Sequence, residues 1–266
     1  MINFASICSH PPIIIPTIGN SADLKKASET IEAMDSLAEK FKESNTKTIL
    51  VISPHGPLDF NQFTIIDSPI LLGHFYNFGD LKTELIFKND LEKIDLIEKS
   101  CLLKDIPLKK IKEKELDHGT LVPLYFLSKK VPGVKIIPIG YSGLSNREHF
   151  EFGKSIKKSL KNERIAVIAS GDLSHRLTPD APAGYSPKGK EFDQKIIEFL
   201  REKKVKEIIN MDSELIEEAG ECGYRSILIL LGILDNTDWE PEILSYQAPF
   251  GVGYLTANFK LNELLH

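Results

Sequence analysis

The chain has 266 residues, of which 42% are hydrophobic and 27% are charged. These proportions are typical of a soluble globular protein and exclude collagen, coiled-coil and disordered architectures. The 33 basic and 38 acidic side chains are interspersed and give a net charge of −5, so no basic field is available for nucleic acid or anionic lipid. We therefore expect no nucleic-acid partner and no membrane partner.

The opening segment is apolar but resembles a signal peptide poorly, because it has no basic region and is interrupted by Pro11, Pro12 and Pro16. The longest other apolar run, residues 227–231, is far too short to span a bilayer. The cysteines are too few and too scattered for a disulfide framework: Cys8, Cys101 and Cys222. The sequence predicts a cytoplasmic protein whose cysteines are thiols.

Short segments rich in Ile, Val and Phe, bounded by Pro, Gly, Ser or Asp, predict strands at residues 2–8, 48–53, 63–67, 135–141, 165–170 and 254–259. Apolar residues at helical spacing predict helices at residues 21–41, 90–102, 146–160, 190–202 and 223–234, and one that His118 opens. The alternating order predicts an α/β protein, with residues 1–266 forming one three-layer α/β/α domain around a mostly buried mixed sheet.

Four of the seven histidines follow a predicted strand or open a predicted helix within a compact loop: His10, His55, His118 and His175. In α/β sheets, ligands collect beyond the carboxyl ends of the strands. Imidazoles placed on one sheet edge can converge on one metal ion or one substrate. His74 and His149 have no such context, and we interpret them as structural or surface residues.

The four histidines differ in the local features of the loops that carry them. Prolines stiffen the loops of His10 and His55, as suits metal ligands, and we expect the two imidazoles to lie within reach of one ion. A position at a helix N-terminus favours the neutral form of His118. Asp172 or Ser174 is expected to orient the ring of His175.

The segment EEAGECGYRS offers a carboxylate that would complete a metal site with the histidines. In this segment Glu221 and Cys222 stand between two glycines. Two imidazoles plus one carboxylate leave open positions on an octahedral ion, the pattern of non-haem Fe(II) oxygen chemistry. The same histidine cluster also suits Zn with an activated water, as in a hydrolase. The commonest nucleotide and redox motifs, among them GxGxxG, Walker A and CxxC, are absent from the sequence.

In this order along the chain, the segments SHPPIIIP, ISPHGPL, LDHGTLVPL, ASGDLSHRL, AGECGYRSI and APFGVGYL resemble the catalytic B-subunit type of class III extradiol ring-cleavage dioxygenases and the related Memo-like proteins. The resemblance runs from about residue 8 to residue 257. It implies that Fe(II) is held by His10, His55 and Glu221, that His175 is the acid/base and that His118 contacts the substrate. A small catecholic aromatic compound and O2 are the implied substrates, and a homo-oligomer is a possible assembly.

Memo-like proteins have a cysteine where the dioxygenases have the carboxylate, and Cys222 matches that position as naturally as Glu221 does. Three functions therefore stand open: an Fe(II) ring-cleaving dioxygenase, a Zn-dependent hydrolase, and a Memo-like protein that binds a metal or ligand without ring cleavage. The dioxygenase is the leading prediction. It favours Glu221 as third ligand, because a carboxylate keeps Fe(II) able to bind a catecholate and O2, whereas a thiolate oxidises beside activated oxygen.

Overall fold

The computed structural model describes residues 2–262. Its strands are β1 (Ile2–Cys8), β2 (Thr48–Ser53), β3 (Phe63–Ile66), β4 (Ile70–Phe75), β5 (Asp80–Asn89), β6 (Leu108–Ile111), β7 (Lys135–Gly140), β8 (Ile165–Ser170), β9 (Trp239–Gln247) and β10 (Tyr254–Leu261). Its helices are α1 (Ser21–Lys26), α2 (Ser28–Glu43), α3 (Leu91–Leu102), α4 (His118–Leu127), α5 (Asn146–Ser159), α6 (Pro187–Arg201), α7 (Val205–Ile209), α8 (Ser213–Ala219) and α9 (Tyr224–Ile233), with 3-10 turns η1 (Pro12–Ile14) and η2 (Tyr76–Phe78).

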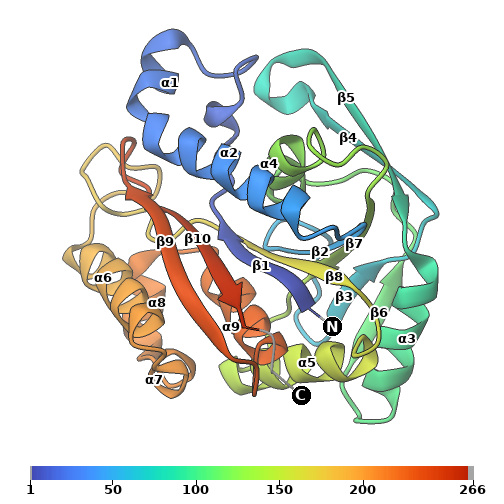
Figure 1. The fold of residues 1–266 in the computed structure, drawn as a ribbon. Helices are drawn as coiled ribbons and strands as arrows, with labels where there is room; N and C mark the ends of the chain where they lie inside the picture. The colour runs from blue at the N-terminus through green and yellow to red at the C-terminus, as the bar shows by residue number, and fades with distance from the viewer. Residues whose placement is uncertain (1, 263–266) are drawn as a thin grey trace.

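One mixed sheet runs through the molecule in the order β4-β5-β7-β2-β8-β1-β10-β9, and β3 and β6 continue from β7 (Figure 1). The central strands β7, β2, β8 and β1 are parallel to one another, whereas β10 and β9 are antiparallel. Every residue of β2 and β8 is buried, as expected of parallel strands covered on both faces. The parallel centre places the carboxyl ends of β1, β2 and β8 at one edge of the sheet.

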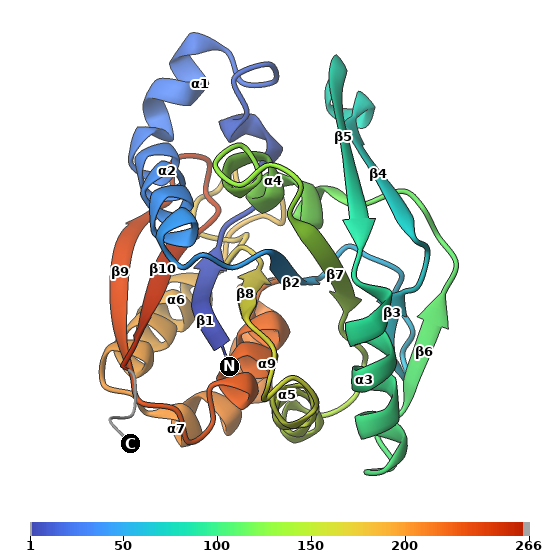
Figure 2. The ribbon, with the colours of Figure 1, turned by 45° about the vertical axis from the view of Figure 1, so that its right-hand side comes forward.

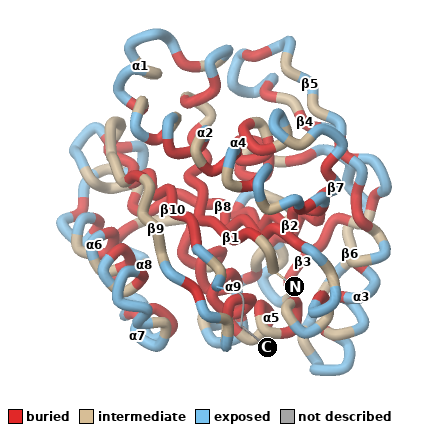
Figure 3. The backbone as a smooth tube through the Cα atoms, viewed as in Figure 1, coloured by how far each residue is buried: buried red, intermediate tan, exposed pale blue. Residues whose placement is uncertain are grey.

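Two apolar cores lie on opposite faces of this sheet, because successive side chains of a strand point to opposite sides. In β1, Ile7 belongs to the core shared with α3, α5, α6 and α9, and Phe4 belongs to the core shared with α2 and α4. Figures 1 and 2 show these helices covering the two faces, and the buried residues in Figure 3 concentrate along the strands between them. The predicted three-layer α/β/α architecture around a buried mixed sheet is confirmed.

The helix predicted over residues 21–41 is two helices, α1 and α2, which meet at Ala27. The break is caused by Gln247 of β9, whose side-chain amide donates to the carbonyl of Lys26 and accepts from the backbone N–H and the hydroxyl of Thr30. A side chain inserted into the hydrogen-bond ladder is a recognised cause of a helix kink. The kink therefore depends on a residue far away in the sequence.

Several elements of the structure were not predicted from the sequence: the β4–β5 hairpin, β6, β9 and α7. β9 contains Pro241, which weakens a strand pattern, and β9 is an edge strand of the sheet, where proline is tolerated. Within residues 2–262 no helix is both long enough and apolar enough to cross a bilayer.

Candidate metal centre

The candidate site lies at the edge of the sheet where the parallel strands end. His10 follows β1, His55 follows β2, and Asp172 and His175 follow β8. These three strands are neighbours in the order β2-β8-β1, so their following loops are brought together. His118 joins them from the first residue of α4.

Three of the predicted imidazoles form a compact cluster. The Nε2 atoms of His10 and His55 are 3.2 Å apart. One ring nitrogen from each of His10, His55 and His118 lies within 4.8 Å of the other two. The rings of His55 and His118 stack with centroids 4.2 Å apart, and His10 is 2% exposed. The predicted convergence of His10 and His55 is confirmed by this distance.

Ser170, the last residue of β8, determines which nitrogen of His10 carries the proton. Its hydroxyl donates to the carbonyl of Gly119 at 2.5 Å, so its 2.9 Å contact with His10 Nδ1 must be one in which Nδ1–H donates to the hydroxyl oxygen. The lone pair of the neutral imidazole then lies on Nε2, which faces His55. A ring fixed in this way is prepared to bind a metal through Nε2.

The loop of His55 is tied to the start of α4. The backbone N–H of His55 donates to the hydroxyl of Ser53, which donates to Asp117 Oδ1 at 2.5 Å. Asp117 is also the N-cap of α4 and accepts from the backbone N–H of Thr120. The capping carboxylate that begins the helix therefore also places His118 against His55.

Cys222 and Glu221 are adjacent in sequence but have different surroundings. The Sγ atom of Cys222 is 3.6 Å from His10 Nε2 and accepts from the backbone N–H of Asp172 at 3.2 Å. The carboxylate of Glu221 instead accepts from the backbone N–H of Tyr224, the first residue of α9. The carboxyl group of Glu221 thus caps α9, and burial raises its pKa to about 7, whereas Cys222 contacts the histidine cluster.

Two glycines allow the loop of Cys222 to approach the end of β8. A Cβ atom on Gly171 would lie 2.1 Å from the Cα of Gly223, closer than any real contact. The backbone N–H groups of Cys222 and Gly223 both donate to the carbonyl of Asp172, at 3.3 and 2.9 Å. The position of the thiol beside His10 therefore depends on direct contact between two backbones.

Asp172 contacts His10 and not His175, contrary to what the sequence suggests. Its Oδ1 accepts from the backbone N–H of His10 at 3.0 Å, and its Oδ2 lies 3.9 Å from His10 Nε2. Burial, reinforced by the nearby Asp193, raises the pKa of the Asp172 carboxyl to about 7. The sequence marks Asp172 by its position, two residues beyond the end of the buried strand β8, but does not reveal its contact with His10.

The turn that carries His175 is held by a buried carboxylate. Asp193 of α6 accepts from the backbone N–H of Ser174 at 2.8 Å and from the hydroxyl of Tyr246 at 2.7 Å. The hydroxyl of Ser174 donates to the carbonyl of Ala219 and does not contact His175. His175 lies close enough to His10 to contribute electrostatically to the lowered pKa of His10.

The imidazoles of the site are neutral near pH 7. Burial is the largest cause in each case: it lowers the pKa of His55 to about 4, lowers that of His10 well below the ordinary value, and lowers those of His118 and His175. Neutral imidazoles offer the lone pair that a metal needs. Burial also raises the pKa of the Cys222 thiol. Imidazole nitrogens with a thiol and a carboxylate close by fit a transition metal such as Fe(II) or Zn.

His149 and His74, which the sequence indicates are structural or surface residues, lie outside the histidine cluster. His149 is buried in α5, where its Nδ1 lies 2.8 Å from the carbonyl of Ser145 and its Nε2 accepts from the backbone N–H of Ser142. The ring of His74 stacks on Tyr76 with centroids 4.1 Å apart.

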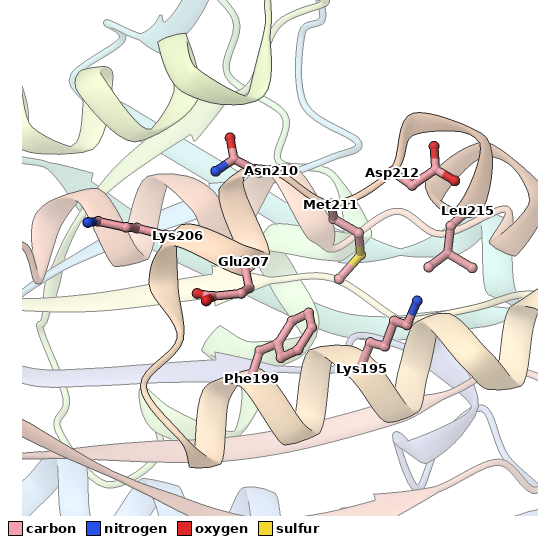
Figure 4. Close-up of a pocket in the computed structure, with 8 residues that line it drawn as sticks. All are labelled: Lys195, Phe199, Lys206, Glu207, Asn210, Met211, Asp212 and Leu215. Atoms are coloured by element: carbon pink, nitrogen blue, oxygen red, sulfur yellow. The ribbon is translucent and has the colours of Figure 1, made fainter.

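A separate pocket of 370 Å³ lies among α6, α7 and α8 (Figure 4). Its lining combines apolar side chains with lysine, asparagine and acidic groups: Lys195, Phe199, Lys206, Glu207, Asn210, Met211, Asp212 and Leu215. No imidazole or thiol lines it. Among the described residues, the cluster suited to a transition metal lies at the carboxyl ends of the strands.

Comparison with solved structures supports the fold. An uncharacterized protein of Escherichia coli K12, JW3007, superimposes with a TM-score of 0.66 at 19% sequence identity, over 96% of this chain and 98% of that chain. The likeness shows a shared arrangement of elements over nearly the full length of both molecules.

Comparison with curated sequences gives two relatives. Protein CA_C1420 of Clostridium acetobutylicum is 34% identical over 264 residues, which are 95% of this chain and 56% of that protein. The 3,4-dihydroxyphenylacetate 2,3-dioxygenase of Escherichia coli is 27% identical over 144 residues, 49% of this chain and 51% of that enzyme. The chain thus spans about half the length of the curated relatives that it matches.

A family model matches residues 4–257, which include every candidate site residue. Its description is the catalytic LigB subunit of aromatic ring-opening dioxygenase. The chain belongs to this family of ring-opening dioxygenase subunits.

Proposed function

We propose that the chain is a metal-dependent enzyme that opens a catecholic aromatic ring with O2, and that His10 and His55 are metal ligands. The observation that carries the proposal is the 3.2 Å separation of their Nε2 atoms. Two bonds of ~2.1 Å to one ion allow a separation of at most about 4.2 Å. The pair therefore needs no large movement to share an ion, and family membership supports the reaction type.

When bound, Fe(II) would supply open coordination positions at which a catechol and O2 meet. The protein's part is to hold the ligands neutral and oriented. Ser170 keeps the proton of His10 on Nδ1, and burial keeps His10 and His55 unprotonated near pH 7. The site thus presents lone pairs without first having to lose protons.

We assign His175 as the group that takes a proton from the substrate hydroxyl, and His118 as a hydrogen-bonding partner of the substrate. Both are half-buried, and burial lowers the pKa of each, so each is neutral near pH 7 and able to accept a proton. Phe78 supplies an apolar wall beside His118, with the two ring centroids 5.2 Å apart.

A second candidate is a Memo-like protein that binds a metal through Cys222 and does not open rings. The observation in its favour is the contact of Cys222 Sγ with His10 Nε2 at 3.6 Å, while Glu221 caps α9. A thiolate is a softer ligand than a carboxylate and favours Zn or Cu(I). In this candidate the 27% identity to 3,4-dihydroxyphenylacetate 2,3-dioxygenase over 144 residues reflects a common origin and not a common reaction.

The test begins with protein purified and reconstituted with Fe(II) in the absence of oxygen. Metal content is measured, and O2 uptake is followed with a panel of catechols that includes 3,4-dihydroxyphenylacetate. Ring opening supports the dioxygenase. Stoichiometric metal binding without turnover of any catechol refutes it and supports the second candidate.

The variants Cys222→Ser and Glu221→Gln identify the third ligand. Loss of metal from Cys222→Ser alone assigns the thiol, and loss from Glu221→Gln alone assigns the carboxylate. His118→Ala is the companion variant, because one nitrogen of His118 lies in the same cluster. Retention of metal with weaker substrate binding supports the substrate role, and loss of metal makes His118 a ligand.

A further inference from the structure

The tip of the β4–β5 hairpin carries an aromatic side chain that the cores of the molecule do not use. Phe78, in η2, is 39% exposed and belongs to neither of the two apolar cores of the described residues. Its ring meets that of His118 edge to face, with centroids 5.2 Å apart and an interplanar angle of 64°. One ring nitrogen of His118 lies in the histidine cluster. The tip of the hairpin therefore borders the candidate metal centre.

A buried carboxylate ties this tip to the loop between η1 and α1. Asp80 begins β5, two residues after Phe78, and is only 4% exposed. Its Oδ2 accepts from the hydroxyl of Thr17 at 2.5 Å, and its Oδ1 accepts from the backbone N–H groups of Lys82 and Thr83 at 2.9 and 3.0 Å. Hydrogen bonds to a charged group are about twice as strong as those between neutral groups. The contact between Thr17 and Asp80 thus holds Phe78 in place.

We propose, on the basis of the proposed function in which a catechol binds at the histidine cluster, that Phe78 packs against the substrate ring and limits the size of its substituents. Aromatic rings prefer edge-to-face or offset contacts, and Phe78 already makes an edge-to-face contact with His118. Removal of the Phe78 ring opens space next to His118, which a larger substituent can then occupy. Thr17 and Asp80 are positioning residues, which act on the substrate only through Phe78.

The test measures catechol binding by calorimetry to protein loaded with Fe(II) in the absence of oxygen, so that no turnover is needed. Phe78→Ala should bind catechol about twofold to tenfold more weakly than wild type, because one aromatic contact is lost. It should bind 4-tert-butylcatechol at least as tightly as wild type does. Metal content should be unchanged. Leu81→Ala is the matched control, because Leu81 is an apolar residue of the same hairpin, is 74% exposed and should affect neither ligand.

A double-mutant cycle tests the positioning role of the contact between Thr17 and Asp80. Thr17→Val keeps the shape of the side chain but removes the hydroxyl that donates to Asp80. It should weaken catechol binding in the wild-type background by a smaller factor than Phe78→Ala does. In the Phe78→Ala background it should have no effect, because the ring that it positions is gone. An effect of equal size in both backgrounds would overturn the positioning role.

The outcomes separate this proposal from the proposed function. A wild type that retains metal but binds no catechol refutes the proposed function, and the role of Phe78 with it. If the wild type binds catechol and Phe78→Ala binds it equally well, with the same preference between the two catechols, the role of Phe78 alone is refuted. Loss of metal from Phe78→Ala would also refute it, by showing that the ring supports the metal centre and not the substrate.

Discussion

The hydroxyl of Ser170 holds the His10 imidazole in the tautomer that exposes Nε2 to the candidate metal site. Both contacts of that hydroxyl are buried, and its acceptor is a backbone carbonyl that cannot act as a donor. The protonation of His10 is thereby set by a residue on the neighbouring strand β8.

Removal of this hydroxyl should weaken metal binding without preventing it. Groups that orient a ligating histidine typically contribute 10-fold to 100-fold to metal affinity, so we expect a loss of about that size in Ser170→Ala. Competition with a chelator measures it. Ser159→Ala is the control, because the hydroxyl of Ser159 bonds only to a carbonyl of its own helix among the described contacts. Equal affinities for wild type and Ser170→Ala would disprove the orienting role.

His10→Ala and His55→Ala should each abolish metal retention while the chain stays folded. Each variant removes one of two nitrogen donors that lie 3.2 Å apart. Metal analysis after gel filtration and a circular dichroism spectrum are the measurements. His74→Ala is the control, because His74 stacks on Tyr76 outside the histidine cluster. Unfolding of both site variants would mean that the two imidazoles serve the fold.

His175→Gln should keep its metal and lose turnover. This expectation rests on the proposed function, and proton transfer of this kind typically contributes about 100-fold to 10,000-fold to a rate. Metal content and O2 uptake with the best catechol are measured on the same sample. Loss of metal would reassign His175 as a ligand, and unchanged turnover would remove it from the mechanism.

Gly171→Ala should destabilise the protein and displace Cys222 from His10. The added methyl group would meet the Cα of Gly223 at 2.1 Å, and overpacking of this kind typically costs about 1–3 kcal/mol. Urea unfolding and metal affinity are both measured. Gly56→Ala is the matched control beside His55, because a Cβ there would meet only Asp117 Oδ2, at an ordinary 3.5 Å. A fully stable Gly171→Ala variant with unchanged metal affinity would contradict the described contact.

The free energy of unfolding should fall in acid partly because of His149. Burial lowers the pKa of His149 from 6.5 to about 4 in the folded protein, so the unfolded chain takes up the proton first as the pH falls. The contribution of neutral His149 to the free energy of unfolding is fully present above pH 6.5 and is lost as the pH falls towards 4. About 2 kcal/mol of it is lost by pH 5.

His149→Phe isolates this contribution in the metal-free protein. The variant is less stable than wild type at pH 7.5, because the backbone N–H of Ser142 loses its partner and the carbonyl of Ser145 keeps only the backbone N–H of residue 149. The deficit of the variant in free energy of unfolding, relative to wild type, should be about 2 kcal/mol smaller at pH 5 than at pH 7.5, because phenylalanine has no proton to gain. Urea unfolding at the two pH values gives the difference. A deficit that is equal at both would show that His149 does not titrate in this way.

The buried strands could be predicted because parallel strands covered on both faces are continuous apolar runs, as in TILVIS of β2. The β4–β5 hairpin could not, because its outer face carries Leu72 and Ile86 where alternation requires polar residues. The local sequence does not predict the break between α1 and α2 either, because Gln247, which causes the break, belongs to β9.

The histidines of the site could be predicted from local features, since a histidine in a stiff loop after a buried strand is placed by that strand. The choice between Glu221 and Cys222 is different. It depends on how the chain turns at Gly220, which adopts a left-handed conformation with φ of 59°, and on the free N–H groups of α9 that attract the Glu221 carboxylate. Neighbouring residues in such a turn point in different directions, and no spacing rule distinguishes them.

The wide separation of His10 and Cys222 along the chain, 212 residues, has a consequence for biosynthesis. β1 is translated well before both of the strands that pair with it, β8 and β10. At 5–20 residues per second, about 10 to 40 s pass between translation of His10 and that of Cys222. Until β8 has been translated, the apolar β1 lacks both of the strands that pair with it. The contact between His10 and Cys222 can form only after β1 to β8 have been translated, so it cannot guide the early steps of folding.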